Sequence, residues 1–525
     1  MEIKHGEMDR RTFMKSTLGA GVGLVLTTST SDLALGKSAT AGGFEDLSLY
    51  QLSKMVRNGE VSSKELVETY LERIQKFDGP KGINAYLTVA GDSALKQAEE
   101  LDKLAKGKKF KGPLHGLPIA IKDNLDTKGI RSTGGSKILS SWIPAADAHV
   151  ILKLKEAGAI ILGKTNMHEF AFGITTNNPH YGPTRNPYDL SKIPGGSSGG
   201  SAAATAASLC AAAIGTDTGG SVRIPSAFCG VVGLRPTVGR VGRGGLMYLS
   251  FTMDTIGPIT RTVTDAAMIM EVIAGKDPRD PESSSKAIPR YTALLKGGLK
   301  GKGFGVPKNF FLDLIHPDTK KVFDESIREI QKMGGIIKEV EVKHSNLYPN
   351  SRNIAMSECV YLVEDYLKAF DPEATIDKYL DQLGPDVKII FGSQKGKPDS
   401  KPIPGYFYIR TIREYRPKVI SGFDEALAGL DALLIPTTPL PAPKIGEDEE
   451  MELEGKKVDT FRTVTRNTNA ISIAGFPAIT VPAGYSQTGL PIGLQFVGRP
   501  WEEDKLLNMA YAFEQATKVR KPPKL

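Results

Sequence analysis

The chain is poor in the residues that build disulfide frameworks and metal sites. Only three of its 525 residues are cysteine and seven are histidine. Cys210, Cys229 and Cys359 form no Cys-x-x-Cys pair, and no His-Glu-x-x-His or mixed Cys/His ligand spacing occurs. We therefore expect no metal site. Because Cys210 and Cys229 stand among alanines and valines, we expect them to be buried as small apolar side chains.

Long apolar runs and concentrated charge of one sign are also missing. A membrane-spanning helix needs about 20 apolar residues, and the sequence has no such run, so stable membrane insertion is not expected. The net charge is +8, but basic residues occur in scattered short runs, such as 105–111 and 296–302. Without a zinc finger, an RNP motif or a basic heptad region, this pattern indicates a solvated surface rather than a nucleic-acid site.

The first residues resemble an export signal. Arg10 and Arg11 precede a phenylalanine, a lysine and a mildly apolar run over 18–26. This order is that of a twin-arginine signal peptide, with small-residue cleavage sites near 36 or 41. We therefore expect residues 1–41 to be a signal and the bacterial product to be periplasmic or secreted. The alternative is an N-terminal tail with two chance arginines.

Residues 42–525 are expected to form a single domain with alternating helices and strands. Ser62 to Glu65 reads as a capping box that opens an amphipathic helix over 62–77. Further helices are expected over 91–106, 150–157 and 201–213, and strands over 118–121, 159–162, 433–436 and 492–497. This alternation predicts an α/β fold with a mixed central β-sheet covered by helices on both faces. The charged, proline-rich stretch 276–430 is expected to be a variable helical insertion.

Two glycine- and serine-rich segments, 195–201 and 215–221, flank an alanine-rich stretch. A flexible linker is the usual interpretation of such composition, but a linker does not fit the middle of a buried region. Gly195 to Gly199 also fits G-x-S-x-G, the nucleophile elbow of α/β-hydrolases, which needs a later histidine. Only His316 and His344 follow, both in the 276–430 stretch, so the elbow is disfavoured.

Together with Lys122, these segments resemble the amidase signature family. Lys122 stands in the motif 116–124, Ser197 follows it by 75 residues, and Ser221 follows Ser197 by 24. The resemblance extends over roughly 45–500, since further motifs of the family occur in the family's order at 163–167, 229–237, 254–258 and 474–478.

The resemblance implies a catalytic triad in which Ser221 is the nucleophile, Lys122 the base and Ser197 a relay held by a cis peptide bond after Gly196. A serine needs a base to become nucleophilic, and a lysine acts as a base when burial disfavours its ammonium form. The apolar run that ends at Lys122 provides such burial. No cofactor is required.

Glycine-rich backbone after the alanine stretch is the expected oxyanion hole, since several N–H groups can point at one atom there. It comprises the backbone of Thr218, Gly219, Gly220 and Ser221. The residues expected to support the catalytic groups from behind are Ser198, Asp217 and Arg223. A buried pair between Asp217 and Arg223 would be structural rather than catalytic.

We expect the reaction to be hydrolysis of a small carboxylic amide, giving an acid plus ammonia or an amine. The main alternative is the glutaminase-type A subunit of glutamyl-tRNA amidotransferase, whose pattern carries a glutamine-holding aspartate where this chain has Thr465. A serine esterase or carbamate hydrolase on the same scaffold, and a non-enzymatic secreted binding protein, are further alternatives. The motif 167–173 weakly favours the indoleacetamide and mandelamide hydrolase branch. A homodimer would be in keeping with the family.

Overall fold

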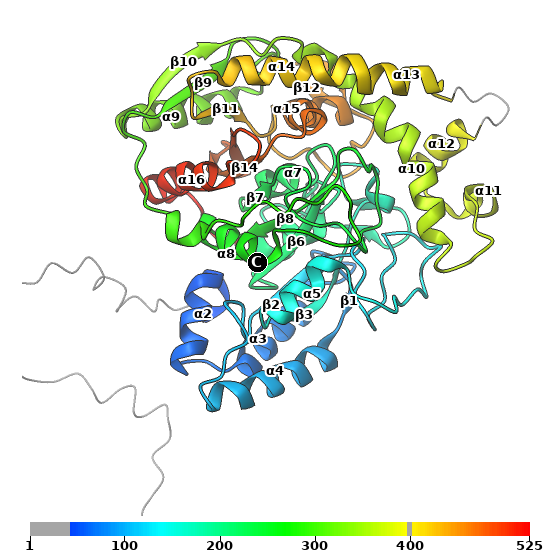
Figure 1. Ribbon diagram of the computed structural model, residues 1–525, viewed down its shortest axis with the longest axis vertical. Coiled ribbons are helices and arrows are strands. Elements are labelled where there is room, and N and C mark those ends of the chain that lie inside the picture. Colours follow the sequence, from blue (N-terminus) through cyan, green and yellow to red (C-terminus); the bar gives the residue numbers. More distant parts are fainter. Residues whose placement is uncertain (1–42, 396–401) are drawn as a thin grey trace, which may run out of the picture. The chain divides into compact units, whose positions relative to one another are not determined.

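The fold is built on a sheet of eleven strands within residues 43–395 and 402–525, the part of the chain that the computed structural model describes (Figure 1). The strand order is β1-β3-β2-β6-β8-β7-β14-β15-β11-β9-β10. The strands are β1 Tyr86–Val89, β2 Pro118–Lys122, β3 Ile160–Thr165, β6 Ala212–Asp217, β7 Val232–Arg235, β8 Thr255–Thr260, β9 Gly303–Pro307, β10 Ile336–Val340, β11 Ala432–Pro436, β14 Ala478–Tyr485 and β15 Pro491–Val497.

Pairing in this sheet is mixed. Strands β3, β2 and β6 run parallel to one another, as do β11, β9 and β10. The strands between these two groups pair antiparallel. This arrangement confirms the predicted α/β class with a mixed central sheet. The expected export signal lies outside the described residues, and so does the boundary at 41/42.

Helices flank the sheet. They are α2 Leu49–Asn58, α3 Ser63–Phe77, α4 Gly91–Lys106, α5 His149–Glu156, α6 Gly199–Ala206, α7 Arg223–Phe228, α8 Val263–Ile273, α9 Pro317–Lys332, α10 Ser351–Leu367, α11 Ile376–Tyr379, α12 Pro385–Gln394, α13 Gly405–Arg410, α14 Arg416–Leu427, α15 Thr460–Ala474 and α16 Glu503–Thr517. Helices α3 and α4 lie side by side next to β2 and β3 (Figure 1). The capping box at the start of α3 is confirmed, because Ser62 Oγ accepts from Glu65 N–H and the Glu65 side chain accepts from Ser62 N–H.

The alanine-rich stretch differs from its prediction as one helix over 201–213. Helix α6 ends at Ala206, Ser208 adopts a positive φ of 54°, and Ala212 begins strand β6. The stretch consists mostly of small side chains, and all of them are buried. Such a run has no distinct apolar face, so neither the helical nor the strand period can be read from it.

The described part of the 276–430 region contains helices α9 to α14 and also supplies strands β9 and β10, which extend the central sheet beyond β11. Helix α9 lies between these two strands in sequence and packs against β10 and β11. A short hairpin, β12 Glu450–Leu453 with β13 Lys456–Asp459, precedes α15.

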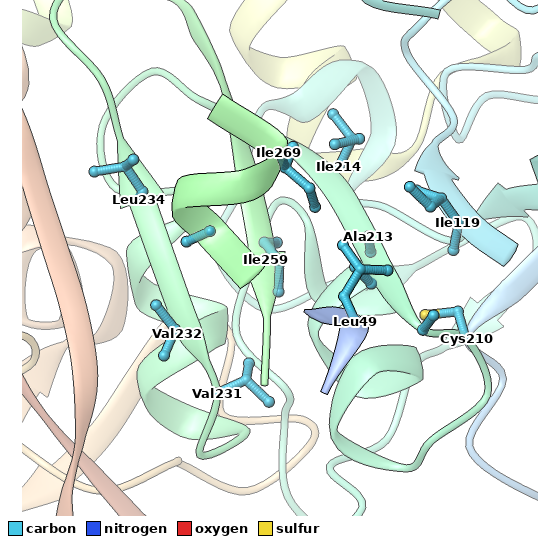
Figure 2. Packing of buried hydrophobic residues seen from close by; sticks show 14 of the residues in the cluster. Leu49, Ile119, Cys210, Ala213, Ile214, Val231, Val232, Leu234, Ile259 and Ile269 are labelled. Carbon is cyan, nitrogen blue, oxygen red and sulfur yellow. The ribbon is translucent and has the colours of Figure 1, made fainter. Parts of the chain in front are cut away.

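The main hydrophobic core lies around β2, β6, β8 and β7. Figure 2 shows side chains of these strands and of the loops before β6 and β7 packed with residues from α2 and α8: Leu49, Ile119, Cys210, Ala213, Ile214, Val231, Val232, Leu234, Ile259 and Ile269. Cys210, Cys229 and Cys359 are buried and free, which confirms the expectation for the first two. Two of the candidate site segments lie next to this core, because Lys122 is the last residue of β2 and residues 218–221 directly follow β6.

Candidate active site

Lys122 is the last residue of β2 and is fully buried. Strands β2 and β6 are parallel neighbours, with Ile121 paired to Ile214, so their carboxyl ends lie together. The Lys122 ammonium nitrogen donates hydrogen bonds to Ser197 Oγ at 2.7 Å and to Thr216 Oγ1 at 2.8 Å. Strand pairing therefore brings the lysine to a serine 75 residues further along the chain.

Burial makes the protonated form of Lys122 less stable. Removing an ammonium group from water disfavours its charged form, and burial here lowers the pKa of Lys122 to about 7. The negative charges of Asp254 and Asp217 oppose this shift, in that order of size. A lysine in this state can accept a proton at neutral pH, which a solvated lysine with its ordinary pKa of about 10.4 cannot do.

Ser197 stands directly before helix α6, in a buried loop whose Gly196–Ser197 peptide bond is cis. Two backbone contacts hold this loop: His168 N–H donates to Ser197 O at 3.3 Å, and Ser198 N–H donates to Ser221 O at 3.3 Å. The second contact joins the two glycine–serine segments, so the structure brings together Lys122, Ser197 and the Ser221 segment. Ser198 Oγ also bonds Thr216 O at 3.2 Å.

The backbone from Thr218 to Ser221, the candidate oxyanion hole and hereafter the nest, directly follows β6. Gly220 N–H donates to Asp217 Oδ1 at 2.9 Å and so is already used. Within the described part of the chain, the amides of Thr218, Gly219 and Ser221 have no acceptor. Gly220 has a φ of 135°, and a Cβ there would lie 2.3 Å from Thr468 Oγ1, so only glycine fits.

Asp217 accepts from the backbone N–H groups of Gly220 and Val222, and its network is larger than one ion pair. It forms ion pairs with Arg223 at 3.0 Å and with Arg235 at 2.9 Å, and all three side chains are fully buried. Burial acts to raise the pKa of Asp217, but the two guanidinium groups hold it well below its usual range. Asp217 thus stays charged and fixes the backbone on which Ser221 stands.

Comparison with known proteins decides the family. A family model described as Amidase matches residues 65–507. The chain belongs to the amidase family. It is 41% identical over 497 residues to the A subunit of glutamyl-tRNA(Gln) amidotransferase of Carboxydothermus hydrogenoformans, covering 91% of this chain and 99% of that protein.

Solved structures agree with this assignment. The native peptide amidase from Stenotrophomonas maltophilia aligns with a TM-score of 0.80 and 34% identity over 92% of this chain and 99% of that chain. The A subunit of glutamyl-tRNA(Gln) amidotransferase from Thermotoga maritima aligns with a TM-score of 0.75 and 32% identity over 92% of this chain and 98% of that chain. The protein is therefore an amide-hydrolysing enzyme, and the non-enzymatic alternative is not supported.

Three residues of this amidase's site were missed by sequence reasoning. Thr216 accepts from Lys122, Arg235 pairs with Asp217, and Asp254 accepts from Thr218 Oγ1 at 2.5 Å. Burial raises the pKa of Asp254, and the hydrogen bond from Thr218 opposes this shift. All three stand in motifs that carried the family resemblance, so the signal was present. Their partners become visible only once β6, β7 and β8 are paired.

Helix α12 of the 276–430 region is fastened to the loop that follows β3. His168 Nε2 and Asp386 Oδ2 lie 2.6 Å apart, and Gly384 N–H donates to Glu169 Oε2 at 2.7 Å. Phe170 stacks on Phe391 with ring centroids 6.2 Å apart. Since His168 N–H also donates to Ser197 O, the amidase connects this helix to the loop that carries Ser197.

Metal ligands and membrane spans are absent from the described residues. Across 43–395 and 402–525, no group of three or more histidine, cysteine or acidic side chains is arranged to hold a metal ion. No helix in the same residues combines the length and apolar character that crossing a membrane requires.

Proposed function

We propose that this amidase forms a serine acyl-enzyme, with Ser221 as nucleophile, Ser197 as proton relay and Lys122 as base. The observation that carries the proposal is the 2.7 Å contact between Lys122 Nζ and Ser197 Oγ at a fully buried site. A buried, neutral lysine that is hydrogen-bonded to a hydroxyl can remove its proton. No metal ion or cofactor takes part in this scheme.

The proposed reaction has two halves, acylation of Ser221 and hydrolysis of the acyl-enzyme. Ser221 Oγ attacks the amide carbon and loses its proton to Ser197 Oγ, whose own proton passes to Lys122. The free amides of the nest stabilise the oxyanion that forms. The proton then returns through Ser197 to the leaving nitrogen as the C–N bond breaks, releasing ammonia or an amine. A water molecule repeats the cycle on the acyl-enzyme and frees the acid.

The motifs in the sequence favoured an independent hydrolase. The sequence relatives instead favour the amidotransferase A subunit and its substrate. Identity of 41% across nearly the full length of both chains supports the amide of glutamine as the first candidate. Those relatives are named as one subunit of an assembly, so a second protein chain is part of this candidate. A homodimer and export by the twin-arginine route remain proposals.

A small carboxylic amide, such as a peptide amide, is the second candidate. Thr465 stands where the A-subunit pattern has an aspartate, and its hydroxyl donates to Phe461 O at 2.8 Å within α15. Helix α15 thus offers no carboxylate at this position. The likeness to a peptide amidase at 34% identity supports the same candidate.

The test is ammonia release by the purified protein from glutamine, peptide amides, arylacetamides and short aliphatic amides, with an ester and a carbamate assayed for acid release. Ser221→Ala should abolish every activity. Ser226→Ala is the matched control, because it removes a buried hydroxyl that has no partner among the described residues. Release from glutamine alone supports the A-subunit candidate, and release from other amides supports the independent hydrolase. Activity that survives in Ser221→Ala would refute the mechanism.

A further inference from the structure

Helix α15 is held against the rim of the nest by its residue Thr468. Thr468 Oγ1 donates to Gly219 O at 2.7 Å, and Thr468 O accepts from Arg223 at 3.1 Å. The preceding Asn467 donates to Pro436 O at 2.9 Å. These bonds fix the helix relative to the nest, so the next side chain, Asn469, has a defined place beside it.

The side chain of Asn469 lies next to Gly219. A Cβ on Gly219 would stand 3.4 Å from Asn469 Oδ1 and 3.9 Å from its Nδ2, which is van der Waals contact. Both residues are only partly buried, whereas their neighbours Gly220 and Thr468 are fully enclosed. The carboxamide of Asn469 is therefore partly exposed directly beside Gly219, within reach of a molecule bound at the nest.

The Asn469 carboxamide is the partly exposed polar group on that part of α15 that makes no side-chain hydrogen bond. Asn467 Nδ2 donates to Pro436 O and Thr468 Oγ1 to Gly219 O, and Thr465 donates its hydroxyl inside the helix. The Asn467 Oδ1 atom also lacks a partner, but it is buried. Among residues 43–395 and 402–525, nothing pairs with the Asn469 side chain. Its two N–H donors and its acceptor are thus free for a ligand.

The surroundings of Asn469 on the helix carry no free charge. Thr465, one turn earlier, is neutral, and Arg466 pairs with Asp313 at 3.1 Å and stacks on Phe310 at 4.5 Å. A neutral carboxamide complements groups that hold a donor and an acceptor close together. An amino-acid or peptide amide carries such a pair next to its acyl chain, as α-amino and carboxyl groups or as a peptide bond.

We infer that Asn469 is a specificity-determining residue that hydrogen-bonds the acyl part of the substrate. It selects amino-acid and peptide amides over plain alkyl and aryl amides. This inference rests on the proposed function, because it assumes that the scissile amide lies at the nest. It goes beyond that proposal by naming the polar groups that the acyl part must carry.

The experiment measures kcat and KM for L-glutamine, an N-acetylated dipeptide amide and butyramide. Asn469→Leu keeps the side-chain size but removes the hydrogen bonds. We expect it to lower kcat/KM for the first two substrates about 10- to 100-fold, mainly through KM, since their polar groups lose a partner. Butyramide should change by less than about threefold, because it has no such groups. Thr463→Val, which changes a partly buried hydroxyl on the same helix, is the control and should leave all three ratios unchanged.

A binding measurement separates this inference from the proposed function. Calorimetric Kd values for the same three amides are taken with Ser221→Ala, alone and combined with Asn469→Leu. Weaker binding of the polar amides only in the combined variant supports Asn469, even if the wild type proves to hydrolyse another bond. Equal effects on all three amides, no effect on any, or hydrolysis of butyramide in preference to the polar amides would overturn the inference.

Discussion

Lys122 Nζ and Ser197 Oγ lie 2.7 Å apart, and neither side chain is exposed to solvent. The lysine comes from the end of β2, and the serine from the loop before α6. Because the contact is sealed from water, proton transfer between these groups depends on their own pKa values and on the charges buried nearby. That dependence makes the proposed mechanism testable through pH.

The activity should rise with pH through the pKa of Lys122. Below about pH 7 the lysine is protonated and cannot act as a base, so kcat/KM should fall on the acid side. Asp254→Asn removes a negative charge that favours the ammonium form, which should lower this pKa and move the acid limb to lower pH. The measurement is a pH–rate profile of kcat/KM.

Thr218→Val provides the control for that profile. It removes the 2.5 Å hydrogen bond to Asp254 but keeps the carboxylate charge. We expect a lower kcat, because the nest loses a support, without the shift to lower pH seen in Asp254→Asn. An acid limb that stays in place in Asp254→Asn would contradict the role given to Lys122.

Replacing Lys122 should separate activity from stability. Lys122→Met should lower kcat by at least about 1000-fold, in the upper part of the range for a lost general base. The melting temperature should not fall, because a methionine fills the same buried volume without the cost of desolvating an ammonium group. Thermal unfolding monitored beside the activity assay decides this, and a clear loss of melting temperature would mean that the lysine is primarily structural.

Asp217→Asn should destabilise the protein by about 3–5 kcal/mol, since it leaves two buried guanidinium groups without their carboxylate. In the wild type the contribution of the Asp217 carboxylate to stability is fully present above the pKa of an aspartate in the unfolded chain, about 3.9. It is lost as the pH falls toward the lower pKa that Asp217 has in the folded protein. Denaturant unfolding at neutral pH gives the value. Asp324→Asn, in an exposed pair with Lys320, should cost no more than about 1 kcal/mol.

Gly220→Ala should damage the nest. The new Cβ would meet Thr468 Oγ1 at 2.3 Å, on a backbone with a φ of 135°. We expect kcat to fall about 100- to 1000-fold, as when an oxyanion-hole donor is lost. Gly489→Ala shares a positive φ of 85° but has nothing within 4 Å, so it should leave kcat unchanged. Equal activity of the two variants would exclude the nest as the oxyanion hole.

Export is tested on the full chain in a bacterium with a twin-arginine pathway. Changing both Arg10 and Arg11 to lysine should retain the protein in the cytoplasm, because the pathway recognises the arginine pair. Cell fractionation and immunoblotting provide the readout. Equal distribution of the two forms would show that the arginine pair is not an export signal.

Much of the fold could be read from local sequence. The capping box at Ser62 and the apolar run that ends at Lys122 each predicted the observed element, because capping and burial leave signals within a few residues. The boundary between α6 and β6 could not be read, because the run from Ser201 to Ala213 has no charged residues to mark a face.

The candidate site was only partly predictable, because residues that contact one another there are far apart in the sequence. The family resemblance named Lys122, Ser197 and Ser221, but it did not show that Asp217 accepts from the Gly220 amide, because this contact depends on local backbone geometry. The ion pair of Arg235 with Asp217 depends on how β7 pairs in the sheet. The free carboxamide of Asn469 depends on how α15 packs against the nest. Such tertiary contacts leave no local signal.

The hydrogen bonds between α12 and residues 168 and 169 restrict which segments can be exchanged between family members. Asp386 and the Gly384 amide come from α12 and the residue before it, whereas His168 and Glu169 lie more than 200 residues earlier in the chain. Each hydrogen bond therefore needs both segments. A chimaera that takes this helical region from another family member would inherit one half of each bond. Residues 168 and 169 would have to be transplanted with it, or the side chains beside the backbone contact to Ser197 O would lose their partners on α12.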